Sequence, residues 1–283
     1  MRKNSPQPTI PKISTILHPL SPILCPLSFS LIFLFMITGC GKSTSTTTNQ
    51  TNMSQEEVSI QLDLAESYIR AGKNRPALEK LLLVKNAVQN NPRLFFDLGH
   101  VYSLMGNYSH AAESFERAVA QEPSFGDAWN YLGQVYAAQH NNAKAIAAYN
   151  TALTIPTYLR QEIPAYNLAD LYNTQGNNDQ AMQYARMAVD KNWRFIPAYL
   201  LLGEMLIAQD KTEEAQKWYE QGAESDLTNT HIMLALGENL IRLDRFSEAR
   251  QWFKRVIATA PSSDDAQMAR DYLASIRPEP IKD

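Results

Sequence analysis

The apolar residues of this chain recur with a period of 34 between residues 58 and 263. Within each period they fall three or four residues apart in two blocks, which is the spacing of an apolar face on an α-helix. A small residue lies inside the first block, where two helices can approach closely. The clearest copy has Phe95, Leu98, Gly99, Tyr102, Ala111, Phe115, Ala118 and Pro123 at the repeating places. The pattern therefore predicts six pairs of antiparallel helices.

This spacing resembles the tetratricopeptide repeat, with its W-x-x-L-G-x-x-Y followed by Ala, Phe and Pro. The six copies are residues 58–91, 92–125, 126–159, 162–195, 196–229 and 230–263, and only residues 160–161 break the register. The resemblance implies an all-α, right-handed superhelical solenoid, because no helix pair buries its apolar faces without neighbours. Residues 264–283 are expected to form a capping helix and tail. In this helix Asp264 and Asp265 stand at the start, Met268, Tyr272 and Ile276 share one face, and Pro278 ends it.

The turn inside each helix pair needs a residue that tolerates positive φ. The residues at this fifteenth place are Gly72, Gly106, His140, Gly176, Asp210 and Asp244. His140 is the unusual member, and we expect Asn141 and Asn142 after it to take the turn instead. Gly99 and Gly133 stand where the two helices of a pair should touch. Folding of the repeats is expected to need neither a metal nor a disulfide.

The N-terminal segment is predicted to be an address signal. Residues 27–37 form an apolar run that is too short to cross a membrane as a helix. Ile37-Thr38-Gly39-Cys40 follows it and resembles the lipobox of bacterial lipoproteins, which implies removal of residues 1–39 and lipid attachment to Cys40. An ordinary membrane anchor is the alternative. Residues 40–57 then form the lipidated cysteine and a flexible tether rich in Ser and Thr.

The same resemblance predicts where the protein resides. Gly41, rather than Asp, implies sorting to the outer membrane of a Gram-negative cell. The protein is therefore expected to be lipid-anchored there, with its repeats facing the periplasm.

Charge and composition exclude several classes of function. The chain has 26 Lys and Arg against 29 Asp and Glu, and residues 1–39 contain three of the basic residues and no acid, which leaves the rest with a net charge of about −6. An acidic body disfavours nucleic acid as a partner. The two cysteines cannot form a disulfide framework or a Cys-rich metal site. No His pair, Ser elbow or Gly-rich loop has catalytic spacing, so we expect no enzyme, no metal and no cofactor.

A groove formed by the first helix of each pair is the candidate binding site. In the tetratricopeptide family the second, fifth, ninth, twelfth and thirteenth places face this groove. Apolar residues at two of these places, with acids beside them, predict an exposed stripe for an amphipathic segment. The candidate partner-binding residues are Leu62, Glu66, Ile69, Phe96, His100, Tyr166, Leu200, Glu204, Ile207, Leu234, Glu238 and Ile241.

The lipobox and six repeats together resemble the type IV pilus biogenesis lipoproteins, the pilotins that help the outer-membrane secretin to assemble. The resemblance includes Tyr158-Leu159-Arg160-Gln161-Glu162, which stands where that family has a similar insertion led by Tyr. It implies secretin subunits as the protein partner. An envelope adaptor for peptidoglycan enzymes or other outer-membrane assembly machinery is the first alternative, and an enzyme is the second.

Overall fold

The computed structural model describes residues 53–276, and all regular structure in this range is helical, as the sequence predicts. The predicted lipoprotein signal, Cys40, most of the tether and Pro278 lie outside the described residues. No helix in the described range has the length and apolar character that a membrane crossing requires. The helices are α1 (Gln55–Arg70), α2 (Asn74–Ala87), α3 (Pro92–Leu104), α4 (Tyr108–Gln121), α5 (Gly126–Ala138), α6 (Asn142–Thr154), α7 (Glu162–Thr174), α8 (Asn178–Lys191), α9 (Ile196–Ile207), α10 (Thr212–Ser225), α11 (Thr230–Arg242), α12 (Phe246–Thr259) and α13 (Asp264–Ser275).

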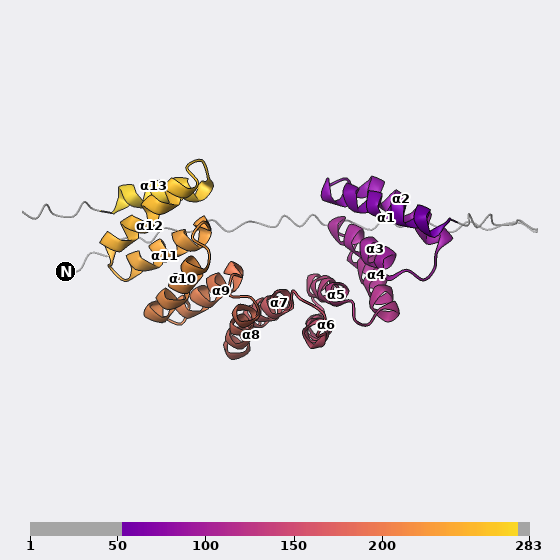
Figure 1. Ribbon diagram of the computed structural model, residues 1–283. Helices are drawn as coiled ribbons and strands as arrows, with labels where there is room; N and C mark the ends of the chain where they lie inside the picture. The colour runs from indigo at the N-terminus through magenta and orange to yellow at the C-terminus, as the bar shows by residue number, and fades with distance from the viewer. Residues whose placement is uncertain (1–52, 277–283) are drawn as a thin grey trace, which may run out of the picture. The chain divides into compact units, whose positions relative to one another are not determined.

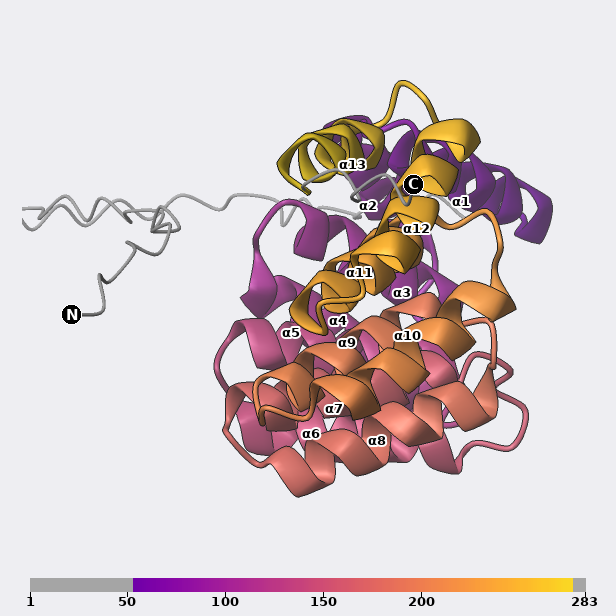
Figure 2. The same ribbon diagram turned by 90° about the vertical axis from the view of Figure 1, so that its left-hand side faces the viewer.

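Consecutive helices pack in antiparallel pairs, and each pair packs on the next (Figures 1 and 2). The odd-numbered helices from α1 to α13 also contact one another along the array, whereas within the described range no two even-numbered helices do. The odd helices are therefore closer together than the even ones, so the array of residues 53–276 curves with its odd helices inside. We call the surface formed by α1, α3, α5, α7, α9 and α11 the inner face.

Local signals explain where the helices begin and end. Asn107, Asn141 and Asn177 each accept a hydrogen bond from a backbone N–H of the first turn that follows. Ser54 and Glu57 form a capping box at the start of α1. The turns inside the helix pairs contain the positive φ values predicted for Gly72, Gly106, Gly176, Asp210 and Asp244. The expectation for the third turn was wrong in detail, because His140 itself adopts φ of 59° and Asn141 instead caps α6.

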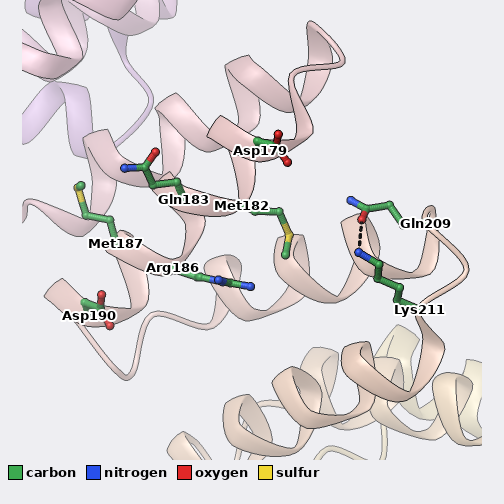
Figure 3. Close-up of a pocket in the computed structure, with 8 residues that line it drawn as sticks. All are labelled: Asp179, Met182, Gln183, Arg186, Met187, Asp190, Gln209 and Lys211. Carbon is green, nitrogen blue, oxygen red and sulfur yellow. Dashed lines mark hydrogen bonds between the residues drawn. The ribbon is translucent and has the colours of Figure 1, made fainter.

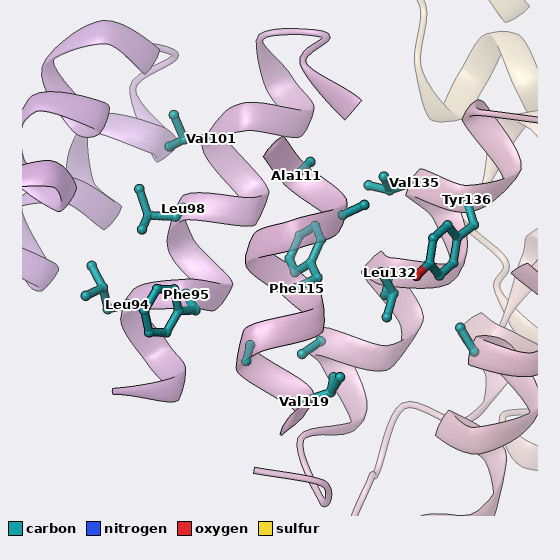
Figure 4. Close-up of a cluster of buried hydrophobic side chains, with 14 of the residues drawn as sticks. Leu94, Phe95, Leu98, Val101, Ala111, Phe115, Val119, Leu132, Val135 and Tyr136 are labelled. Atoms are coloured by element: carbon teal, nitrogen blue, oxygen red, sulfur yellow. The ribbon is translucent and has the colours of Figure 1, made fainter. Parts of the chain in front are cut away.

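Close contact inside each pair depends on the size of two facing residues. A Cβ atom added to Gly133 would lie 2.5 Å from the Tyr149 ring, and one added to Gly99 would lie 2.7 Å from the Phe115 ring. Gly203 and Gly237 face Tyr219 and Phe253 in the same way. The small residue therefore gives room for an aromatic ring, and around Gly99 and Gly133 the buried side chains form one hydrophobic cluster (Figure 4).

The connection between α6 and α7 is longer than the others. It comprises residues 155–161, whereas the other connections between helix pairs have four residues each. Ile155 and Tyr158 pack on Ala152 and partly buried Trp129, and Gly126 leaves space for the Tyr158 ring. The insertion is thus held by its own small apolar cluster.

The last helix closes the apolar end of the array, with one difference from the prediction. Tyr272 stacks on Phe253 with ring centroids 5.0 Å apart, and Ile276 is buried. Met268 is 45% exposed, so it does not share their buried face. Ala266 and Ala269 take that place, because small side chains let α13 approach α12 closely.

Candidate functional site

The twelve predicted groove residues all lie on odd-numbered helices, but their apolar members do not form an exposed stripe. Leu62 is 2% exposed and Leu234 is 6% exposed, so both belong to the core. Ile69, Leu200, Ile207 and Ile241 are partly buried and pack against that core. The predicted exposure was wrong, because neighbouring side chains cover Leu62 and Leu234 almost fully and the other apolar members in part.

The second and third pairs show how this covering works. Phe96 has ring centroids of Phe125 and Tyr131 at 4.8 and 5.5 Å, and both neighbours come after α4 in the chain. His100 lies 5.1 Å from the Tyr131 ring, and burial lowers its pKa. Phe96 and His100 therefore form an aromatic cluster with Tyr131 in which only part of each ring meets solvent.

A charged cluster lies between α1 and α3. The Arg93 guanidinium donates to Asp63 at 2.7 Å and to Glu66 at 3.0 Å, and its Nε lies 3.9 Å from the carboxylate of Asp97. Burial raises the pKa of Asp97 to about 7, with Arg93 opposing this and Glu66 and Asp63 adding to it. Glu66 is thus held by an arginine, which the groove prediction did not include.

The C-terminal half of the inner face is acidic. Asp170, Glu204 and Glu238 occupy the same place on α7, α9 and α11. Burial, with a contribution from Asp170, raises the pKa of Glu204. Within residues 53–276 no Lys, Arg or His nitrogen lies within 4.0 Å of these three carboxylates. Tyr166 on α7 is half-buried beside them, edge-on to the ring of Phe195. This half of the inner face therefore offers negative charge next to partly exposed apolar surface.

An apolar pocket of about 570 Å³ opens between α4, α5 and α6, and the sequence analysis did not find it. Its walls include Val119, Trp129, Leu132 and Ala148, with Ala147 at the rim. The corresponding place in the other five repeats carries a long polar side chain, namely Glu79, Glu113, Gln183, Lys217 and Gln251. The small Ala147 was the sequence signal for this pocket.

A second pocket, of about 550 Å³, lies between α8 and the turn from α9 to α10 (Figure 3). Its lining combines charged, amide and Met side chains, and Lys211 donates to Gln209 at 3.0 Å. The lining residues are Asp179, Met182, Gln183, Arg186, Met187, Asp190, Gln209 and Lys211. They include no Ser, Cys or His, and among residues 53–276 no group of three His, Cys, Asp or Glu is placed to hold a metal.

The four tryptophans have different environments. Trp129, Trp218 and Trp252 are partly buried and pack on the core. Trp193 is 62% exposed in the connection between α8 and α9.

Comparison with known proteins agrees with this architecture. Three family models described as tetratricopeptide repeat match residues 96–158, 165–190 and 206–271. Two solved structures are similar over most of the chain. The crystal structure of PilW, described as a widely conserved type IV pilus biogenesis factor, gives a TM-score of 0.62 at 20% identity, covering 77% of this chain and 100% of PilW. The structure of pilF from Pseudomonas aeruginosa gives 0.62 at 17% identity, covering 78% of this chain and 98% of that protein.

Curated relatives match the repeats at low identity. The chain is 28% identical over 142 residues to a UDP-N-acetylglucosamine–peptide N-acetylglucosaminyltransferase of Giardia intestinalis, covering 49% of this chain and 9% of that enzyme. It is 22% identical over 212 residues to a lipoprotein NlpI homolog of Haemophilus influenzae, covering 72% of this chain and 64% of that protein. The chain spans at most 18% of the length of four of the curated relatives, the transferase among them.

Proposed function

Because this chain is built of tetratricopeptide repeats and such an array is a protein-interaction scaffold, we propose that it is a non-enzymatic lipoprotein of the outer membrane that assists assembly or localisation of a type IV pilus secretin. The fold is one that non-enzymatic scaffolds typically use. The observation that carries the proposal is the fold likeness to PilW along the whole of that protein. The same sequence adds a lipobox ahead of the repeats.

Lipid attachment at Cys40 is part of this proposal. The lipobox Ile37-Thr38-Gly39-Cys40 directly follows an apolar run. A relative that is 22% identical over 212 residues is named as a lipoprotein homolog. Two or more acyl chains make membrane attachment durable, because each buried CH₂ contributes about 0.8 kcal/mol. The lipid would hold the scaffold, and a secretin subunit bound to it, at the outer membrane.

The inner face indicates what kind of segment such a partner would present. Asp170, Glu204 and Glu238 supply negative charge that no described basic side chain neutralises at close range. Tyr166 and Leu200 add partly exposed apolar area beside them. A secretin segment with apolar anchors and basic flanks matches this surface, because its basic residues complement the acids and its anchors contact the apolar area.

The test is to purify the full chain from its own cells in mild detergent, measure the intact mass of the N-terminal peptide, and identify the proteins that co-purify. We expect a diacylated or triacylated Cys40 and a secretin subunit. Cys40→Ala should give unprocessed or soluble protein and reduce secretin multimers in the outer membrane. Mature, membrane-bound protein from that variant would contradict the lipid anchor. A lipidated protein that captures no secretin would contradict the pilus role alone.

An envelope adaptor is the second candidate. The lipoprotein NlpI homolog covers 72% of this chain, which favours a tethered scaffold without specifying a pilus. Peptidoglycan enzymes or outer-membrane assembly components in the co-purified fraction, in place of a secretin, would support this role.

A further inference from the structure

One edge of the array consists of the connections between helix pairs together with the first turns of the odd helices. We call it the loop edge. Hydrogen bonds and ion pairs join its neighbouring parts. Gln121 donates to the carbonyl of Gln89 at 3.2 Å, and Asn192 donates to Glu162 at 3.4 Å. These contacts link neighbouring parts of the loop edge, which borders the inner face where the odd helices begin.

Three large apolar side chains project from consecutive connections of the loop edge. Leu159 is 91% exposed, Trp193 is 62% exposed and Leu227 is 53% exposed. They lie after α6, α8 and α10, and each is 34 residues from the next. Pro123 and Pro261 stand at the place of Trp193 and Leu227 in other repeats, so bulky apolar residues replace a small ring here. Each exposed side chain forgoes the favourable free energy that burial of its apolar surface would give.

The loops that carry these side chains are held by specific contacts. The Tyr199 hydroxyl donates to the carbonyl of Trp193 at 2.9 Å, and the backbone N–H of Arg194 donates to Asn192 at 3.0 Å. The backbone N–H of Thr228 donates to Asp226 at 2.9 Å. The outward placement of Trp193 and Leu227 is thus built into the loop geometry.

The N-terminal segment joins the array at the same edge. Met53 and Gln55, at the start of α1, line one pocket together with Val88 and Asn91 of the connection between α2 and α3. Cys40 is 13 residues before Met53. A fully extended chain of that length spans about 45 Å. A lipid on Cys40 would therefore tether the array at its loop edge.

We propose that the loop edge faces the lipid surface and that Leu159, Trp193 and Leu227 enter its interfacial layer. This inference rests on the proposed lipidation of Cys40. Trp suits the interface because its ring is apolar and its N–H can meet headgroups. Separate apolar residues on successive loops can each enter the interface, whereas a protein partner usually fills a contiguous patch.

The charges near Trp193 predict how this docking depends on lipid and salt. Lys191 and Arg194 stand close in sequence to Asp190, and the positive charge of Arg194 helps to lower the pKa of Asp226. Arg160, beside Leu159, is paired with Asp127. Because the positive and negative charges near these loops nearly balance, contact with the membrane depends on insertion of the apolar side chains. It should be insensitive to salt and to anionic lipid.

The experiment measures tryptophan emission of the full-length lipidated protein in phosphatidylcholine vesicles with and without brominated acyl chains. Bromine quenches only nearby indoles, and Trp193→Phe identifies the share that belongs to Trp193. We expect quenching in the wild type, loss of most of it in Trp193→Phe, and weaker quenching in Leu159→Ser/Leu227→Ser. The matched control is Leu104→Ser/Met105→Ser, whose residues are 51% and 43% exposed at the C-terminal end of α3, on the opposite edge. It should quench like the wild type.

The outcomes separate this inference from the proposed function. Intact mass is measured first, and a protein without lipid counts against the lipoprotein proposal. A lipidated protein whose Trp193 emission is the same in both vesicles overturns the loop-edge proposal alone. Quenching that persists unchanged in Trp193→Phe also overturns it. In cells, a photo-crosslinker placed at position 193 should capture lipid, and capture of a protein instead would assign this edge to a protein partner.

Discussion

Asp97 is a buried acid whose charge is opposed by its surroundings. Only 7% of its side chain is exposed, and its Oδ2 has no hydrogen-bond partner within the described residues. Its pKa of about 7 lies above the ordinary value of 3.8. The folded chain therefore binds this proton more tightly than the unfolded chain does. The stabilising contribution is complete below pH 3.8 and is lost as the pH rises through 7.

Replacing Asp97 with Asn should remove this pH dependence. Between about pH 4 and pH 8 the free energy of unfolding of the wild type should fall relative to Asp97→Asn by on the order of 2–4 kcal/mol, from about 1.36 kcal/mol per pKa unit. Urea unfolding at a series of pH values measures the difference. Asp63→Asn is the control, because Asp63 pairs with the same Arg93 but its side chain is 63% exposed. Parallel pH profiles for wild type and Asp97→Asn would show that Asp97 is not the titrating group.

Leu62 and Ile60 test the corrected position of the first helix. Leu62 is 2% exposed, whereas Ile60 on the same helix is 54% exposed. Leu62→Ala should lower the free energy of unfolding by about 2–5 kcal/mol, because it leaves a cavity in the core. Ile60→Ala should change it by less than about 0.5 kcal/mol. Thermal or urea melts of the two variants give the comparison. Equal stability of the two variants would mean that Leu62 lies on the groove surface and not in the core.

At the scale of the helix pair, the eighth and twenty-fourth places match each other in size. Gly faces an aromatic ring in four pairs, as Gly133 faces Tyr149. The first and fourth pairs have Ala65 and Ala169 at the eighth place, and there the twenty-fourth place is Leu81 or Ala185. The helix separation is thus set jointly by both residues, because two bulky side chains cannot occupy one close contact.

This relation predicts a coupled double substitution. Gly133→Ala should destabilise the fold by about 1–3 kcal/mol, because its Cβ would overlap the buried Tyr149 ring. Tyr149→Leu in the same chain should recover part of that loss, since the pair then matches Ala65 and Leu81. Unfolding free energies of both single variants and the double variant form a cycle with a coupling of about 0.5–3 kcal/mol. Strict additivity would mean that the two residues do not limit the approach of α5 and α6.

At the scale of the whole array, α13 protects the last apolar surface. Solenoid stability depends on each repeat and its nearest neighbours, so an uncovered end destabilises the adjoining helices first. Deleting residues 264–283 uncovers Phe253 and removes partly buried Tyr272 and buried Ile276, of which Ile276 contributes roughly 1.5–3 kcal/mol by burial. Hydrogen exchange should then speed up in α11 and α12 and stay unchanged in α3 to α6. Deleting only residues 277–283 is the control and should leave exchange as in the full chain.

The sequence by itself determined the helix pairs, their turns and the small residues at their contacts. These features are local or repeat at a fixed period, so a spacing of three, four and 34 residues is enough to identify them. Positive φ at Asp210 and Asp244 followed from the same period, although nothing in the residue type alone requires it.

Only the tertiary structure decided which repeating positions are exposed. The inner face curves, so Phe96 is covered by Phe125 of the connection after α4 and by Tyr131 of α5, and Asp97 is enclosed between α1 and α3. The same packing leaves a pocket above Ala147 and turns Leu159, Trp193 and Leu227 outward. Periodicity places a residue on one side of its own helix. Its burial depends on the length and direction of side chains from other helices, and these vary from repeat to repeat while the period does not.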